Sequence, residues 1–230
     1  MKKQNVLIIG NKPYKNFNLN SVVDSFDVIY RFNMVCPGNN NGTKFGKLAM
    51  CSHVYGNFAN DLISKEKTVE IYGDQLGVEF LHEWYDFYKA NKQNFEEIFY
   101  ERTDKYSMNK LLSLYNCPYK FSKLPSTGYS VMFKNMLQGN DVYVSGFTIC
   151  EDEIRTTQGE IEEFAVSKNV KDVCHSFSEE RDILAWLHNN NKIDATLCML
   201  EDTSEVNLKP NKYRTLPSRF ILDLLNKEKK

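Results

Sequence analysis

Short apolar runs that end in turn residues occupy the first third of the chain. The run at residues 5–10 is continuously apolar from Val6 to Ile9 and closes on Gly10, which is typical of a buried strand in a parallel sheet. Comparable runs predict strands at residues 27–30, 48–54 and 68–72. About fifteen residues separate the first two runs, which is enough for a tight crossover between parallel strands.

Helical patterns dominate the rest of the chain. Apolar residues recur at helical spacing over residues 76–90, 108–115 and 179–189. Another helix is predicted to begin at Pro125-Ser126-Thr127-Gly128 and to end at Gly139-Asn140. Two further strands are predicted, at residues 141–146 and 195–200. Strands that alternate with helices indicate one α/β domain over residues 1–208, with a mostly parallel sheet flanked by helices.

Composition and charge exclude several classes of function. The 230 residues are 42% hydrophobic and 26% charged, as in an ordinary globular protein. The net charge of -1 argues against a nucleic-acid partner, because duplex-binding domains carry a strong basic excess. The six cysteines form no CxxC pair, which argues against a zinc ribbon, and no apolar run approaches the roughly 18 residues of a transmembrane helix. The apolar run from Val6 to Ile9 is shorter than a signal peptide requires, so we expect a cytoplasmic protein with free thiols.

The last 22 residues differ from the rest in charge. Residues 209–230 hold seven basic and two acidic side chains, and residues 216–225 place apolar side chains on one helical face. Such a basic amphipathic segment favours peripheral contact with a membrane surface. An ordinary terminal helix packed on the core is the alternative.

Asparagines follow three of the predicted strands. Asn11 comes after Gly10, Asn33 comes after the second strand, and Asn57 comes shortly after the third. The carboxyl ends of parallel strands share one edge of the sheet, where open α/β sheets bind their ligands. An asparagine offers two donors and an acceptor without charge, which suits a ribose, a pyrimidine edge or a phosphate. Each asparagine alone is equally typical of a turn.

Two further segments could carry chemistry. Ser126, Thr127 and Gly128 begin a helix, where unpaired N–H groups and the helix dipole attract anions, although a plain helix cap has the same sequence. His175 precedes another helix, with Glu180 five residues later, and a neutral histidine is a suitable general base. Neither the dinucleotide-binding glycine pattern nor the P-loop pattern is present, so those two readings lack support.

Taken together, these segments resemble the sialyltransferases, both the animal-type family and its short bacterial relatives. Residues 5–33 are similar to the large donor-binding motif, and Gly42-Thr43-Lys44 is similar to its later portion. Residues 125–147 are similar to the small motif. His175, four intervening residues and Glu180 match the short His-x4-Glu motif.

The resemblance implies a variant of the GT-A fold with a small lid within residues 147–178. It also implies inverting, metal-independent transfer of sialic acid from a CMP-activated donor to a hydroxyl of an oligosaccharide or glycolipid. By position it gives His175 and Glu180 catalytic roles, with His175 as the base. The residues that it assigns to the donor nucleotide are Gly10, Asn11, Lys12, Asn33, Asn57, Ser126, Thr127 and Gly128.

Two features of the sequence bear on that mechanism. No Asp-x-Asp pair is present to hold a divalent metal on a diphosphate, so no cofactor is expected. The bacterial relatives carry a tyrosine pair against the leaving phosphate, whereas residues 148–163 hold no tyrosine, and Arg155 is the candidate replacement. A transferase that uses CMP-Kdo to build lipopolysaccharide or capsule at the inner membrane, and a non-catalytic nucleotide-binding module, remain the alternatives.

Overall fold

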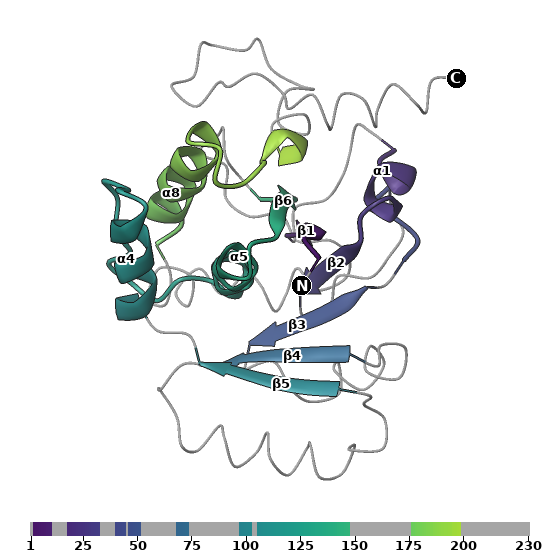
Figure 1. Ribbon diagram of the computed structural model, residues 1–230, viewed down its shortest axis with the longest axis horizontal. Coiled ribbons are helices and arrows are strands. Elements are labelled where there is room, and N and C mark those ends of the chain that lie inside the picture. Colours follow the sequence, from purple (N-terminus) through teal and green to yellow (C-terminus); the bar gives the residue numbers. More distant parts are fainter. Residues whose placement is uncertain are drawn as a thin grey trace, which may run out of the picture.

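Parallel strands form one sheet at the centre of the molecule (Figure 1). The computed structural model describes residues 2–10, 18–32, 40–44, 46–51, 68–73, 97–102, 105–147 and 176–198. In these residues the sheet has six strands, in the order β5-β4-β3-β2-β1-β6. The strands are β1 (Asn5–Ile9), β2 (Val28–Phe32), β3 (Lys47–Cys51), β4 (Thr68–Gly73), β5 (Glu97–Arg102) and β6 (Asp141–Ser145).

Helices cover both faces of the sheet, which confirms the predicted α/β class. The described helices are α1 (Asn20–Asp24), α4 (Lys105–Leu114), α5 (Thr127–Leu137) and α8 (Phe177–Asn189). α4, α5 and α8 lie on one side of β1 and β6, and α1 lies on the other (Figure 1).

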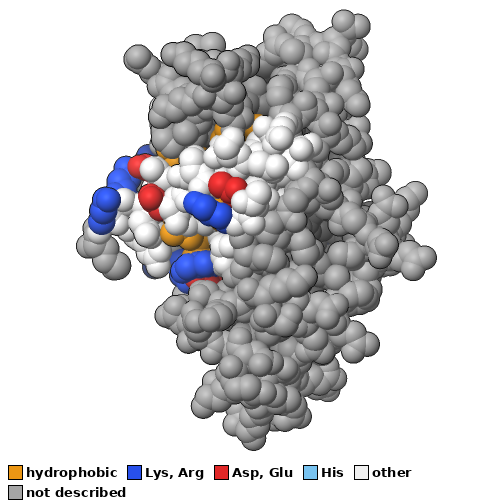
Figure 2. Space-filling model, turned by 90° about the vertical axis from the view of Figure 1, so that its right-hand side faces the viewer, with side chains coloured by type: hydrophobic (Ala, Val, Ile, Leu, Met, Phe, Trp, Pro, Cys, Tyr) orange, Lys and Arg blue, Asp and Glu red, His pale blue; other side chains and the backbone are white. Residues whose placement is uncertain are grey.

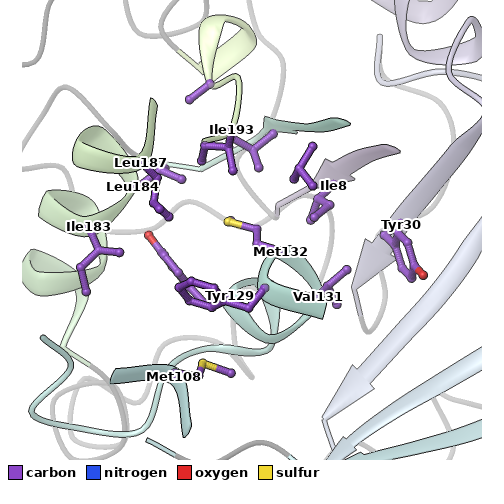
Figure 3. Close-up of a cluster of buried hydrophobic side chains, with 14 of the residues drawn as sticks. Ile8, Tyr30, Met108, Tyr129, Val131, Met132, Ile183, Leu184, Leu187 and Ile193 are labelled. Carbon is purple, nitrogen blue, oxygen red and sulfur yellow. The ribbon is translucent and has the colours of Figure 1, made fainter. Parts of the chain in front are cut away.

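The apolar run of β1 is continuous because both of its faces are buried. Val6 and Ile8 pack toward α5 and α8, whereas Leu7 and Ile9 pack toward α1. Successive strand residues point to opposite faces, so a strand that is covered on both sides needs apolar residues at every position. On the first face, side chains from α5 and α8 close the core over the sheet (Figure 3).

The strand order places a topological switch point between β1 and β6. From β1 the chain moves outward through β2, β3, β4 and β5, and it then returns to the other side of β1 as β6. Ile9 is paired with Arg31 of β2 and with Ser145 of β6. Open α/β sheets bind ligands at such a point, beyond the carboxyl ends of the strands.

Several predicted bounds need correction. α8 begins two residues before the predicted 179, and β3 is described from Lys47 to Cys51, whereas residues 52–54 of its predicted range lie outside the described residues. β5 has no counterpart among the predicted strands. Its short run of apolar residues is bordered by charged ones, so it fits neither the alternating nor the continuous strand pattern.

The predicted strand at residues 195–200 is wrong over its described part. Asp194 pairs with Tyr143 as a single bridge, and residues 196–198 are helical. The carboxylate of Asp194 accepts the N–H of Thr196 at 2.9 Å, which starts a helical turn instead of a strand. The predicted helix at residues 76–90 and the tail at residues 209–230 lie outside the described residues.

Gly10 and Gly146 bring the backbones of β1 and β6 into close contact. The N–H of Gly10 donates to the carbonyl of Ser145 at 2.7 Å. A Cβ on Gly10 would lie 2.3 Å from the carbonyl oxygen of Gly146, and a Cβ on Gly146 would lie 2.6 Å from that of Gly10. Gly146 also has φ +68°, which L side chains rarely adopt.

Gly146→Ala is therefore expected to destabilise the protein more than the same substitution at a turn glycine whose added Cβ would meet no other atoms. We expect a loss of at least about 3 kcal/mol, from the left-handed backbone and the contact with the Gly10 carbonyl. Gly139→Ala is the matched control, because Gly139 has φ +77° with nothing within 4 Å, and it should lose about 1 kcal/mol. Urea denaturation measures both losses, and equal losses would show that the β1–β6 contact is unimportant.

Candidate functional site

The beginning of α5 lies at the switch point. A Cβ on Gly128 would lie 2.7 Å from ring atoms of Phe147, which follows β6 and Gly146. The Phe147 ring in turn meets Phe32, the last residue of β2, edge to face at 6.4 Å between centroids. The first turn of α5 is therefore held beside the carboxyl ends of β2 and β6.

Four of the predicted site residues meet here. Gly10 directly follows β1, Ser126 is the N-cap of α5, and Thr127 and Gly128 are its first residues. Helix geometry leaves the N–H groups of Thr127 and Gly128 without a partner inside α5, and in the described part of the chain no other acceptor takes them. Two backbone donors at the positive end of a helix dipole form an environment suited to an anion.

Ser126 does not cap its own helix in the usual manner. Its side chain makes no capping bond, although its backbone is extended at φ -66° and ψ 157°. Instead, its Oγ donates to Glu180 Oε2 at 3.0 Å and its N–H donates to Glu180 Oε1 at 2.7 Å. The glutamate of α8 therefore holds the beginning of α5 through two hydrogen bonds.

The contact between α8 and α5 continues around Glu180. The carboxyl group of Glu180 is buried, and its backbone carbonyl accepts the hydroxyl of Tyr129. Burial and the nearby charge of Glu180 raise the pKa of Tyr129 well above its usual value, so this hydroxyl stays protonated and donates. A hydrogen bond from the Ser122 N–H to Glu179 at 2.8 Å adds a second link between the same segments.

These contacts give the carboxylate of Glu180 a structural partner. A carboxylate that accepts two hydrogen bonds from Ser126 orients the first turn of α5, where the free N–H groups lie. This is the geometry of a positioning residue. The backbone carbonyl of Ser176 accepts the N–H of Glu180 at 3.0 Å, and Ser176 directly follows His175 in the sequence.

Gly42-Thr43-Lys44 forms a turn that is fixed from two sides. Arg31 is fully buried at the end of β2, and its Nη2 donates to the carbonyls of Asn41 at 2.9 Å and Lys44 at 2.8 Å. Asp24 of α1 accepts the N–H of Thr43 at 2.9 Å and that of Lys44 at 3.0 Å. This part of the large motif is thus a structural turn behind β2.

Asp24 stays ionised in that turn. Burial raises the pKa of its carboxyl group, but hydrogen bonds from Thr43 and Lys44 outweigh burial and hold the pKa below its usual value. Sequence reasoning did not single out Asp24 or Arg31. For Arg31 the available signal was a charged side chain that continues an apolar strand and needs buried partners to be tolerated, whereas Asp24 ends α1 and carries no such signal.

The other predicted site residues lie outside the described residues. They are Asn11, Lys12, Asn33, Asn57, Arg155 and His175, and with them most of the predicted lid. Asn11 and Asn33 directly follow residues that end β1 and β2, which are paired in parallel. Asn57 lies six residues after Cys51, the last described residue of β3.

Two further properties concern the described part of the chain only. No three His, Cys, Asp or Glu side chains gather there as ligands for a metal ion. Among its helices, none combines the length and the apolar character needed to cross a bilayer. Cys117 and Cys198 are buried there as free thiols.

Known structures share this architecture. The crystal structure of a mammalian sialyltransferase matches with a TM-score of 0.57 and 18% identity, over 83% of this chain and 68% of that chain. A mammalian sialyltransferase in complex with Gal-beta-1-3GalNAc-ortho-nitrophenol matches with a TM-score of 0.53 and 13% identity over the same shares. No protein-family model and no curated protein matches the sequence. The chain has a sialyltransferase-like fold.

Proposed function

We propose that this protein is a glycosyltransferase that moves sialic acid from CMP-sialic acid to a hydroxyl of an oligosaccharide or glycolipid. The observation that supports it is the pair of N–H groups of Thr127 and Gly128 at the β1–β6 switch point, for which the described residues provide no acceptor. The likeness to sialyltransferase structures gives that place in the fold a chemical interpretation. In this proposal the fold is a variant of GT-A with a lid within residues 147–178.

The leaving group of such a reaction is CMP, which carries its charge on one phosphate. In the proposal the N–H groups of Thr127 and Gly128 donate to that phosphate, and the dipole of α5 stabilises the charge as the bond to the sugar breaks. Asn11, Lys12, Asn33, Asn57 and Arg155 are the proposed side-chain contacts to the nucleotide. With donors of this kind, the mechanism needs no metal ion.

Ser126 has a narrower role in this site than its sequence suggests. Its N–H and its hydroxyl proton are both directed to Glu180. The Oγ keeps its lone pairs, so in the proposal it accepts a hydrogen bond from a ribose hydroxyl of the nucleotide.

The proposed base is His175. As the bond from the acceptor oxygen to the anomeric carbon forms on the face opposite CMP, the acceptor hydroxyl loses its proton to the imidazole. The bond to the CMP oxygen breaks, CMP leaves with its electron pair, and the anomeric configuration inverts. An oxocarbenium-like centre needs little nucleophile strength, so one positioned base suffices.

Calorimetric titration in buffer with EDTA tests the donor class. CMP is expected to bind, with UMP, NAD and S-adenosylmethionine at least about tenfold weaker. In the proposal the hydroxyl of Thr127 is a further donor to the nucleotide, so Thr127→Val, which removes it and keeps the N–H, should weaken CMP binding by about fivefold. Gln138→Ala, at the far end of α5, is the matched control and should bind as wild type does.

Two results would count against this proposal. Equal binding of UMP and CMP would contradict recognition of a cytosine, and CMP binding that appears only with added metal would contradict the metal-free mechanism. Turnover with CMP-Kdo instead of CMP-sialic acid would assign the other 2-keto acid donor to the same site.

A further inference from the structure

The segment that contains α4 has a one-sided charge. Between residues 105 and 140 the sequence holds five lysines and no aspartate or glutamate, although the whole chain has a net charge of -1. Lys134 pairs with Glu70 from outside the segment at 3.1 Å, and elsewhere in the described residues basic and acidic side chains also lie close together, as in the pair of Lys3 and Asp141 at 2.7 Å. The face that carries α1 shows this mixture of signs (Figure 2).

α4 directs a mixed apolar and basic stripe away from the core. At about 100° per residue, Tyr106, Lys110 and Leu114 fall within about 80° of one another, and Met108 and Leu112 lie on the opposite side of the helix. Burial agrees with this geometry, because Met108 and Leu112 are buried whereas Tyr106 is 77% and Leu114 is 70% exposed.

The segment after α4 adds two exposed side chains of the same two kinds. Tyr119 is 38% exposed and is followed by the exposed Lys120. Lys105 is exposed at the start of α4, and its ammonium group donates to the carbonyl of Ser122 at 2.7 Å, so the two ends of the segment lie together. We call the side chains of Tyr106, Lys110, Leu114, Tyr119 and Lys120 the α4 surface.

We propose that the α4 surface docks this protein onto an anionic lipid surface. Lysines near such a surface are attracted by its negative potential, each contributing roughly fivefold in affinity. Tyrosine suits the boundary between head groups and acyl chains, and leucine suits the acyl region. Leu114 favours lipid over an anionic glycan, because a glycan stacks on aromatic rings but offers nothing to an exposed aliphatic side chain.

The α4 surface adjoins the candidate site. Ser126 follows Lys120 by six residues, and the intervening Ser122 is bonded to Glu179 in the first turn of α8. A membrane that contacts α4 therefore lies next to the segment that leads to the start of α5. This docking proposal does not depend on which donor the protein uses. It also places the membrane contact on α4 and not on residues 209–230.

Sedimentation with lipid vesicles tests the docking. The full chain is mixed with vesicles of phosphatidylcholine alone or with about one third phosphatidylglycerol, and we expect at least about tenfold tighter binding to the anionic vesicles, weakened by salt. Lys110→Glu combined with Lys120→Glu should weaken that binding at least about tenfold, and Leu114→Ser about threefold. Lys2→Glu, at an exposed lysine outside the α4 surface, is the control and should change binding by less than about twofold.

Other outcomes would overturn the docking proposal. One is a full chain that binds neither kind of vesicle. Another is a set of α4 variants that bind as wild type does while deletion of residues 209–230 abolishes binding. A third is binding to heparin as tight as to anionic vesicles with no effect of Leu114→Ser, which would indicate an anionic glycan.

CMP titration separates this proposal from the proposed function. The Lys110→Glu, Lys120→Glu variant should keep its melting temperature and its CMP affinity, because both lysines are exposed and outside the nucleotide site. A wild-type chain that binds anionic vesicles but not CMP would refute the donor site and leave the docking surface standing.

Discussion

Glu180→Ala is expected to destabilise the protein by about 2–3 kcal/mol and to weaken CMP binding by at least about tenfold. The substitution removes both carboxylate contacts to Ser126, which lie at 2.7 and 3.0 Å in a buried position. The start of α5 then loses the contact that fixes its direction, and the N–H groups of Thr127 and Gly128 lose their alignment. Urea denaturation and CMP titration measure the two effects.

Glu180→Gln separates positioning from proton transfer. Glutamine keeps the shape and can still accept the N–H of Ser126, so a positioning residue should retain turnover within about tenfold of wild type. A residue that exchanges a proton would instead lose turnover as fully with glutamine as with alanine. Glu179→Ala is the neighbouring control, because Glu179 is less buried and accepts the N–H of Ser122, and it should cost about 1 kcal/mol.

The elements that the sequence predicts best are those with strong local signals. β1 is apolar at every buried position, and α5 has a serine start and ends before Gly139 at φ +77°. β5 lacked such a signal because it is an edge strand, held by one neighbour, and its sequence matches no strand period. At residues 196–198 the hydrogen bond from the Thr196 N–H to the side chain of Asp194 starts a helical turn. A single hydrogen bond of this kind leaves no trace in the spacing of apolar residues, so the sequence pattern could not predict it.

For the candidate site, too, the sequence predicts some features and not others. Its location follows from sequence, since Gly10 and residues 126–128 both lie at ends of predicted elements. The roles of individual residues do not follow, because they depend on partners far apart in the chain. Gly10 is needed for contact with Gly146, and Glu180 holds Ser126, which is 54 residues away.

Two residues that the resemblance assigns to the donor nucleotide, Gly10 and Gly128, also have framework contacts. Arg31 and Asp24 hold the turn at residues 40–44, and Gly128 leaves room for Phe147. Substitutions at these positions should therefore lower stability together with activity. A residue that touches the nucleotide or the acceptor should instead lose activity on substitution while the protein keeps its stability.

His175→Ala is the variant for which that signature is expected. If His175 takes the acceptor proton, turnover should fall by about 10²–10⁴, whereas CMP affinity should change by less than about twofold. Release of CMP from CMP-sialic acid with a panel of galactoside acceptors measures turnover, and calorimetry measures CMP affinity.

His188→Asn is the matched control for a histidine with a structural role. The Nδ1 of His188 accepts the N–H of Ala195 at 3.0 Å, and burial lowers the pKa of His188, with Asp194 opposing that shift. Asparagine keeps the acceptor, so this variant should lose some stability and little turnover. Near-normal turnover in His175→Ala would remove His175 as the base, and loss of CMP binding in the same variant would place it in the nucleotide site instead.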